Sequence, residues 1–311
     1  MLPTTIQPFT LLSDQDGLPL SGLLLLPQEE TTPCGILQVS HGMCEHKERY
    51  LDFLRHCTKQ GYICLIHDHR GHGESISDTI PLGYFGEDGA EALVADLHQM
   101  TEWIQTQYAG LPLYLLGHSM GSFYARQYLC EWGSELSGAI IMGTGFQPKA
   151  LVQLAKTICR VLAVFFGWQH RSKLVASLSF TGYNKGLEGR TPQDWLNRDA
   201  AEVDKYRADE RCMFTFTLNA YYSMFTGILR LYDPAVLARM PKDLPLLFLA
   251  GDADPVGEQG AGVKRAVKSL LDAGVKNIEV KLYPSARHEL LVELNREEVF
   301  ADIGDWLERR L

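Results

Sequence analysis

The chain has 311 residues, of which 46% are hydrophobic and 22% charged, and its formal net charge is −9 at pH 7. This is the composition of a globular protein, which excludes a disordered or fibrous chain. The negative charge argues against a nucleic-acid partner, because proteins that bind polyanions present a basic field. The cysteines are odd in number and lack CxxC spacing, which favours reduced thiols and a cytoplasmic location over a disulfide framework.

The sequence predicts neither a secretion signal nor a transmembrane segment. The N-terminus, MLPTTIQPFTLLSDQDG, lacks the basic stretch and the apolar core of a signal peptide. The most apolar later stretch, 151–168, is interrupted by Lys156 and Arg160, whereas a membrane span needs about 20 nearly uncharged residues. We therefore expect an amphipathic or partly buried helix there, with at most transient contact with a membrane surface.

In chain order the sequence opens with two strand-like runs, 9–12 and 20–26, which the turn residues SDQDG join into an antiparallel hairpin. Short apolar runs then recur, each typical of a strand buried on both faces of a parallel sheet: 36–39, 62–66, 113–116, 139–142, 246–250 and 278–282. Longer helix-like stretches lie between or after them: 47–60, 89–108, 120–132, 260–273 and 296–311. This alternation predicts a doubly wound α/β sheet.

The alternation stops between about 143 and 245, where the sequence has no comparable strand runs and is rich in aromatic residues. We expect an α/β core formed by 1–144 and 241–311, and a mostly helical cap formed by 145–240. Insertions at the carboxyl ends of such a sheet are where ligands bind. The alternative is a second structural domain with an ordinary aromatic core, and on either interpretation most of the aromatic residues are core residues.

The strongest local signal is the sequence LYLLGHSMG, which places a G-x-S-x-G motif at 117–121 between an apolar strand and an amphipathic helix. A serine on such a sharp turn has a strained backbone, and glycines two residues on either side allow close contact with other backbone. We therefore predict that Ser119 is a nucleophile, although a serine at a helix start is more often only an N-cap. The adjacent His118 is expected to be a packed, hydrogen-bonded neighbour and not the base.

A tetrahedral intermediate needs two backbone N–H donors directed at its oxygen. One is expected from Met120, directly after the nucleophile. The other is expected from the loop after the strand 36–39, which reads HGMCEH from residue 41. We assign it to the backbone of Met43, with Gly42 as the neighbouring alternative.

In this architecture the chain order is serine, then acid, then histidine. The base is expected after the last strand, where His288 is the only histidine beyond His170. The acid is expected after the strand 246–250, where Asp252 and Asp254 compete. A charge held past the strand end, with a proline fixing the chain after it, favours Asp254, and Asp252 is then a hydrogen-bonding loop residue.

The stretch HDHRGH, which contains His67, His69 and His72, is dense enough in histidine to suggest a metal site. The residues straddle a strand end, so His67 and His69 share one face while Asp68 points to the other. We favour a structural, hydrogen-bonded loop beside the active site. No dinucleotide-binding glycine fingerprint and no P-loop is present, so we expect neither a metal nor another cofactor.

Taken together, the ordered motifs resemble those of the lysophospholipase and monoacylglycerol-lipase-like α/β-hydrolases, a group often labelled serine-aminopeptidase-like. The motifs are HGMCEH (41–46), DHRGHGES (68–75), GHSMG (117–121), GDADP (251–255) and YPSARHE (283–289). The resemblance covers essentially the whole chain outside about 145–240. It implies a mostly parallel eight-stranded sheet, a helical cap and hydrolysis of esters with acyl or glyceryl parts.

By motif position the resemblance assigns the nucleophile to Ser119, the acid to Asp254 and the base to His288, with oxyanion donors at Met43 and Met120. The third position of the oxyanion loop is often a small residue in this family. The bulkier Met43 therefore predicts a narrower pocket.

The leading prediction is a carboxylic-ester hydrolase whose partner is a small acyl ester or lipid, such as a monoacylglycerol or lysophospholipid, because an apolar aromatic cap suits an acyl chain. A peptidase or amidase of the proline-iminopeptidase kind is the first alternative. It would need an acidic clamp for the substrate amine, for which the cap offers Glu188, Asp194, Asp199, Glu202 and Asp204. The second alternative is a catalytically silent binding protein on a hydrolase scaffold. The sequence does not indicate an oligomeric state.

Overall fold

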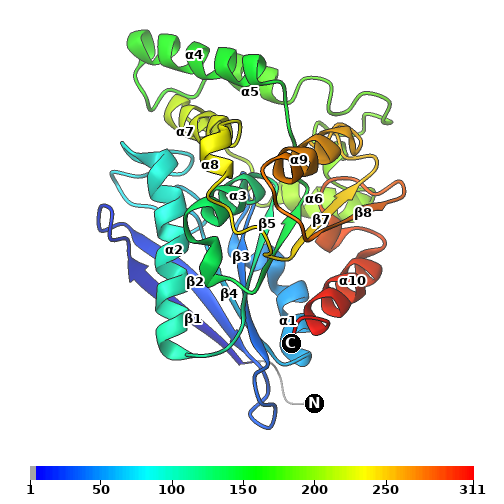
Figure 1. The fold of residues 1–311 in the computed structure, drawn as a ribbon. Coiled ribbons are helices and arrows are strands. Elements are labelled where there is room, and N and C mark those ends of the chain that lie inside the picture. Colours follow the sequence, from blue (N-terminus) through cyan, green and yellow to red (C-terminus); the bar gives the residue numbers. More distant parts are fainter. Residues whose placement is uncertain (1–4) are drawn as a thin grey trace.

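The computed structural model describes residues 5–311 and contains one eight-stranded sheet with helices packed around it (Figure 1). The strand order is β1-β2-β4-β3-β5-β6-β7-β8. β2 pairs antiparallel with β1 and with β4, and all other neighbouring pairs are parallel. The strands are β1 (Thr5–Leu12), β2 (Pro19–Leu26), β3 (Gly35–Ser40), β4 (Tyr62–His67), β5 (Leu113–His118), β6 (Gly138–Met142), β7 (Leu246–Gly251) and β8 (Ile278–Tyr283). Every run predicted as a strand lies within one of them.

The helices that alternate with the strands also lie where the sequence predicts them. They are α1 (Leu51–Lys59), α2 (Gly89–Gln107), α3 (Met120–Trp132), α9 (Ala261–Asp272) and α10 (Arg296–Glu308). The first predicted stretch is divided, because its opening turn is a 3-10 helix, η1 (Lys47–Tyr50), that precedes α1. The fold is therefore the predicted doubly wound α/β sheet.

Strand β5 illustrates how the two faces of the sheet become buried. Leu113 and Leu115 pack into the core formed with α2, α3 and α9, while Tyr114 and Leu116 pack into the core formed with α1 and α10. Successive side chains of a strand point to opposite faces, so an uninterrupted apolar run fills both cores. Each buried leucine contributes roughly 1.5–3 kcal/mol. The carboxyl end of β5, where the serine motif begins, is thus anchored in the most buried part of the molecule.

Between β6 and β7 the described residues contain helices and loops but no strand. The helices are α4 (Lys149–Phe166), α5 (Lys173–Ser179), a 3-10 turn η3 (Asp194–Leu196), α6 (Ala200–Ala208), α7 (Leu218–Arg230) and α8 (Pro234–Leu237). Figure 1 shows α4 lying beyond α7, on the side away from the sheet. Some aromatic side chains of this region, such as Phe216 and Tyr221, are fully buried, whereas Phe165 and Phe166 are exposed. The division into a core of residues 1–144 and 241–311 and a cap of residues 145–240 stays a prediction.

This helical region touches the loops at the carboxyl ends of the parallel strands. The Cys44 thiol donates to the carbonyl of Phe214 (3.3 Å), and the Thr217 hydroxyl donates to the carbonyl of Gly83 (2.7 Å). These contacts involve the loops that follow β3 and β4. The region therefore lies over the edge of the sheet at which ligands bind in α/β folds.

No helix within residues 5–311 combines the length and the apolar character that crossing a bilayer requires. The apolar stretch at 151–168 falls mainly in α4, which buries Val152, Cys159 and Ala163 and leaves other apolar side chains exposed. The expectation of an amphipathic helix without a transmembrane span is confirmed for these residues.

Candidate active site

Ser119 lies on the sharp turn between β5 and α3, where the sequence predicts it. Its backbone is strained, with a φ of +52°, a region that L-residues rarely adopt and that costs roughly 1–3 kcal/mol. Two close approaches explain the flanking glycines. A Cβ on Gly117 would lie 2.5 Å from the Gly121 carbonyl oxygen, and a Cβ on Gly121 would collide with the Ser40 carbonyl. The Ser119 N–H donates to the Met142 carbonyl (2.9 Å), which ties the turn to β6.

His288 and Asp254 form a buried pair at the ends of β8 and β7. The distance between His288 Nδ1 and Asp254 Oδ2 is 2.9 Å, and the side chains are 2% and 0% exposed. The other Asp254 oxygen accepts the Val256 N–H (2.9 Å). A carboxylate oxygen accepts hydrogen bonds, so His288 Nδ1 is the donor of this pair, and Nε2 is the ring nitrogen that remains available.

Asp252, the competing acid, has a different environment. It is exposed, and its Oδ1 accepts the Ser285 N–H (2.6 Å). The structure therefore brings Asp254, and not Asp252, onto His288.

His288 also lies against the serine turn. The ring of His118, the residue before Ser119, has its centroid 4.9 Å from that of His288. The His118 Nε2 is 3.3 Å from the His288 carbonyl oxygen. A Cβ on Gly143, just beyond β6, would lie 3.1 Å from His288 Cε1. The turn that carries Ser119 thus lies beside the His288–Asp254 pair, at the edge of the sheet where the loops after β5, β7 and β8 begin.

The loop of residues 41–46, which is expected to supply an oxyanion donor and is called the oxyanion loop below, passes directly over the serine turn. A Cβ on Gly42 would lie 3.1 Å from Ser119 Cβ. The Gly42 N–H is already taken, because it donates to Glu45 Oε1. The N–H groups of Met43 and of Met120, at the first position of α3, have no acceptor within residues 5–311. The geometry therefore favours Met43 over Gly42 as the available donor of this loop.

Comparison with known proteins identifies the family of the chain. A model of the family described as serine aminopeptidase, S33, matches residues 31–295. The chain belongs to this family of α/β-hydrolases. The matched residues contain all five ordered motifs, and the sheet is eight-stranded and mostly parallel, as the family resemblance implies.

Several similar proteins are lipases or esterases by name. The monoglyceride lipase of Mus musculus is 31% identical over 90% of this chain and 84% of its own length. The monoacylglycerol lipase of Mycolicibacterium smegmatis is 25% identical over 89% of each. A thermostable carboxyl esterase from Bacillus coagulans superposes with a TM-score of 0.90 at 27% identity, covering 99% of both chains.

The structure reveals a buried polar cluster behind the site that sequence reasoning missed. Glu45 Oε1 accepts from the Tyr50 hydroxyl (2.7 Å) and from His118 Nδ1 (3.1 Å), besides the Gly42 N–H. Arg49 lies against Glu45 (3.5 Å) and also pairs with Glu289, the residue after His288 (2.7 Å). The cluster therefore joins the oxyanion loop, the serine turn and the loop that carries His288.

The charges in this cluster stabilise one another. Burial alone would raise the pKa of Glu45, but the hydrogen bond from His118 and the nearby positive charges outweigh it and hold the pKa below its ordinary value. Burial alone would lower the pKa of His118, but its hydrogen bond to Glu45 outweighs that effect and raises it. His118 thus forms an ion pair with Glu45, in keeping with its predicted role as a hydrogen-bonded neighbour.

The histidine-rich loop is buried and its rings pack on one another, but both ring nitrogens of His67, His69 Nδ1 and His72 Nε2 have no hydrogen-bond partner within residues 5–311. His69 Nε2 is 2.9 Å from the Ser40 hydroxyl, and the His69 N–H donates to His41 Nε2 (2.9 Å). Burial lowers the pKa of His67 to about 3, which keeps that ring neutral. Among residues 5–311 the one cluster of metal-type donors is a different one, formed by His46, Asp209 and Cys212. The structural interpretation of the loop stays a prediction.

Proposed function

We propose that the chain hydrolyses carboxylic esters through an acyl-enzyme intermediate on Ser119. The observation that carries the proposal is the buried His288–Asp254 pair beside a strained serine turn. His288 Nε2 takes the proton from Ser119 Oγ as the oxygen attacks the ester carbonyl carbon, and then gives it to the departing alkoxide. Water repeats the sequence on the acyl-enzyme, releasing the acid. Asp254 stabilises the imidazolium that forms in each step.

The negative oxygen that develops on the carbonyl would be bound by the N–H groups of Met43 and Met120. Both N–H groups are free of protein acceptors within residues 5–311, and the Met120 N–H also lies at the N-terminus of a helix, whose dipole favours negative charge. One such donor typically contributes about 3–4 kcal/mol to lowering the barrier.

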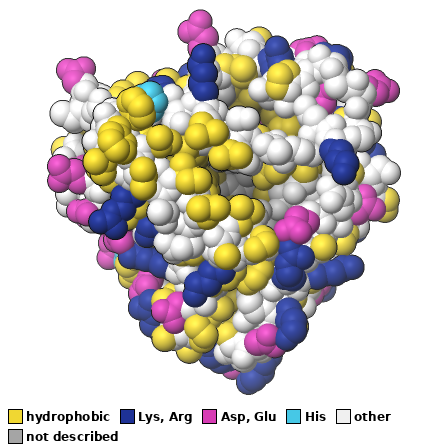
Figure 2. Space-filling model, turned by 90° about the horizontal axis from the view of Figure 1, so that it is seen from above, with side chains coloured by type: hydrophobic (Ala, Val, Ile, Leu, Met, Phe, Trp, Pro, Cys, Tyr) yellow, Lys and Arg dark blue, Asp and Glu magenta, His cyan; other side chains and the backbone are white. Residues whose placement is uncertain are grey.

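We propose a monoacylglycerol, a lysophospholipid or a shorter acyl ester as the substrate, bound under a cap formed by 145–240. Relatives that cover most of the chain are monoglyceride lipases by name. Figure 2 shows a hollow whose surroundings are largely hydrophobic on this face of the molecule. Exposed apolar side chains of α4, α5 and the segments beside them support transient contact with a lipid surface: Leu151, Leu154, Val161, Val164, Phe165, Phe166, Trp168, Leu174, Leu178 and Phe180.

No specific observation favours the peptidase alternative. Such an enzyme would need free acidic groups for a substrate amine, but four of the five candidate carboxylates have local partners, and the fifth, Glu188, is exposed. Asp194 accepts from Thr191, Asp199 caps α6 through the Ala201 N–H, and Glu202 pairs with Lys205. Asp204 pairs with Arg190. These contacts are typical of helix ends and solvated helix faces.

We also propose a cytoplasmic location. All the cysteines are free thiols, and all but Cys34 are buried. Proteins of oxidising compartments more often pair their cysteines.

Hydrolysis of p-nitrophenyl esters from acetate to palmitate, beside an aminoacyl p-nitroanilide, tests the proposal. We expect ester turnover that depends on Ser119, with little anilide cleavage, and the best chain length will report the depth of the acyl pocket. Preferential anilide cleavage would support the peptidase alternative. An absence of turnover on every substrate would support a silent scaffold.

Replacement of Glu45 by glutamine is expected to lower kcat about 100-fold with little change in KM. The substitution removes the charge that orders the oxyanion loop and His118, and a displacement of about 1 Å in such a group can cost that much. Steady-state kinetics would measure the effect. Glu135→Gln is the matched control, because Glu135 forms a comparable pair with His98 on the surface (3.0 Å). Equal kcat values for the two variants would contradict the role of Glu45.

A further inference from the structure

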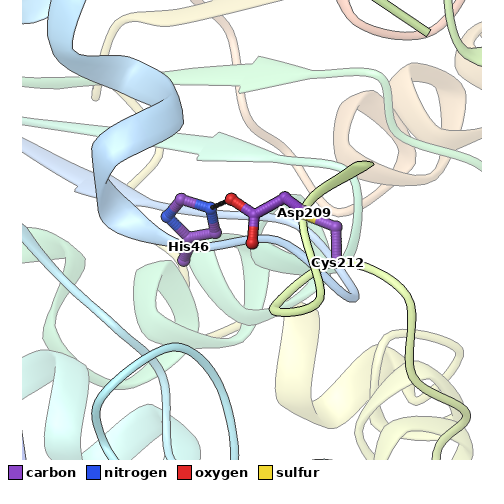
Figure 3. Close-up of side chains that lie close together, drawn as sticks. All are labelled: His46, Asp209 and Cys212. Carbon is purple, nitrogen blue, oxygen red and sulfur yellow. Dashed lines mark hydrogen bonds and ion pairs between the residues drawn. The ribbon is translucent and has the colours of Figure 1, made fainter. Parts of the chain in front are cut away.

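His46, the last residue of the oxyanion loop, is clamped between two carboxylates. Its Nδ1 is 2.6 Å from Glu48 Oε2, and its Nε2 is 2.9 Å from Asp209 Oδ2, which belongs to the segment just after α6. Figure 3 shows the ring directed at Asp209, with Cys212 on the same short segment. The ring is 3% exposed. A residue of the oxyanion loop is therefore bonded directly to the helical region.

The geometry requires His46 to carry a positive charge. Ionised carboxylates only accept hydrogen bonds, so both ring nitrogens must donate, which makes the ring an imidazolium. Burial alone would lower the pKa of His46, but hydrogen bonds to Cys212 and Glu48 outweigh it and raise the pKa to about 10. The pKa of Asp209 is lowered, chiefly by its hydrogen bonds from Arg211.

Arg211 closes this arrangement into a ring of alternating charges. Its Nη1 is 3.2 Å from Glu48 Oε2, and its Nη2 is 2.9 Å from Asp209 Oδ2. We call His46, Glu48, Asp209 and Arg211 the His46 cluster. Such a closed network stabilises the structure more than isolated surface ion pairs do, because each of its members is held in place by several bonds.

The same two segments are joined by further contacts next to the donor residue Met43. The Tyr206 hydroxyl donates to the Cys44 carbonyl (3.0 Å), and the Cys44 thiol donates to the Phe214 carbonyl (3.3 Å). Cys44 has a φ of +53°. A non-glycine residue keeps such a backbone only where its surroundings determine it. Here those surroundings are supplied by the segment 206–214.

The donors of His46, Asp209 and Cys212 lie within 4.8 Å of one another, which also suggests a metal site (Figure 3). A metal would need a lone pair on His46, but both ring nitrogens donate protons to carboxylates. Arg211 adds positive charge at Asp209, and Arg49 Nη1 lies 4.0 Å from the Cys212 sulfur. This charge opposes a divalent cation. The cluster is better explained as a charged hydrogen-bond network.

We propose that His46, held by Asp209, is a positioning residue that fixes the oxyanion loop so that the Met43 N–H faces the reacting carbonyl. The inference rests on the proposed ester hydrolysis. It makes the helical region a part of the catalytic apparatus, because Asp209 and Tyr206 supply the contacts that hold the loop.

Asp209→Asn and His46→Gln test the proposal with a short-chain p-nitrophenyl ester. Each variant is expected to lower kcat about tenfold while KM changes little, since an oxyanion donor acts mainly in the transition state. The double variant should lose no more than the more damaged single one, because both break the same bond. Asp204→Asn is the matched control, since this carboxylate, in the middle of the neighbouring helix α6, pairs with Arg190 and is well exposed.

A second measurement separates this inference from the proposed function. Hydrogen exchange of the peptide that contains residues 41–46 should be faster in Asp209→Asn than in the wild type and in Asp204→Asn, whether or not the chain turns over esters. A wild type without ester turnover would overturn the proposed function only. Unchanged exchange, or an active wild type matched by Asp209→Asn in kcat, would overturn the positioning role. Saturable binding of Zn²⁺ that is lost in Cys212→Ser would also overturn it, because the cluster would then be a metal site.

Discussion

Ser119→Ala is expected to abolish ester turnover, lowering kcat by about 10⁶-fold, and to leave the fold intact. The hydroxyl is the attacking group in the proposed mechanism, whereas the turn itself is held by backbone contacts, such as the hydrogen bond from the Ser119 N–H to Met142. Kinetics with a p-nitrophenyl ester, together with circular dichroism and a thermal melt, would measure both parts of the prediction.

Ser122→Ala is the matched control for this variant. Ser122 lies on the first turn of α3, and its hydroxyl donates to the Ser119 carbonyl (2.5 Å), so it shares the environment without the proposed chemistry. We expect its kcat to stay within about tenfold of the wild type, the scale of losing one local hydrogen bond. Wild-type rates in Ser119→Ala, or equal losses in the two variants, would contradict the assignment of the nucleophile.

Asp254→Asn is expected to lower kcat about 10⁴-fold, whereas Asp252→Asn should change it only a few-fold. Asp254 is fully buried and accepts the His288 Nδ1 proton, so an amide there would favour the wrong tautomer of the ring. Asp252 is exposed and bonds the Ser285 N–H. The two residues are two positions apart and undergo the same substitution, so each serves as the control for the other. The reverse ranking of the two kcat values would move the acid to Asp252.

The sheet was predictable because each of its strands has a recognisable local pattern of apolar residues. A strand such as β5 is apolar on both faces, and glycine or polar turn residues bound it, so both its type and its limits are local properties of the sequence. The helical region was predictable only in outline. Its helices are defined by packing on one another, as with α4 against α7 and Trp168 against Tyr222, and no local pattern gives those pairings.

The candidate site likewise contains residues that a local sequence motif predicts and residues whose contacts depend on packing. Ser119, His288 and Asp254 could be placed from motifs, because each follows directly after a predictable strand. The partners of Glu45 could not be predicted from motifs, since His118 is 73 positions away and the ion pair depends on how two loops pack. The His46–Asp209 contact spans 163 positions and joins two loops of different parts of the chain. The nearest sequence signal was the HGMCEH motif itself, which contains Glu45 and His46 without indicating their partners.

Covalent labelling tests the central claim most directly. The chain would be treated with a fluorophosphonate, which transfers a phosphonyl group to an activated serine and releases fluoride, and then analysed by peptide mass spectrometry. We predict one adduct per chain, on the peptide that contains Ser119, formed far more slowly in His288→Ala and not at all after heat denaturation. An unlabelled native chain, or labelling that leaves Ser119 unmodified, would contradict the account.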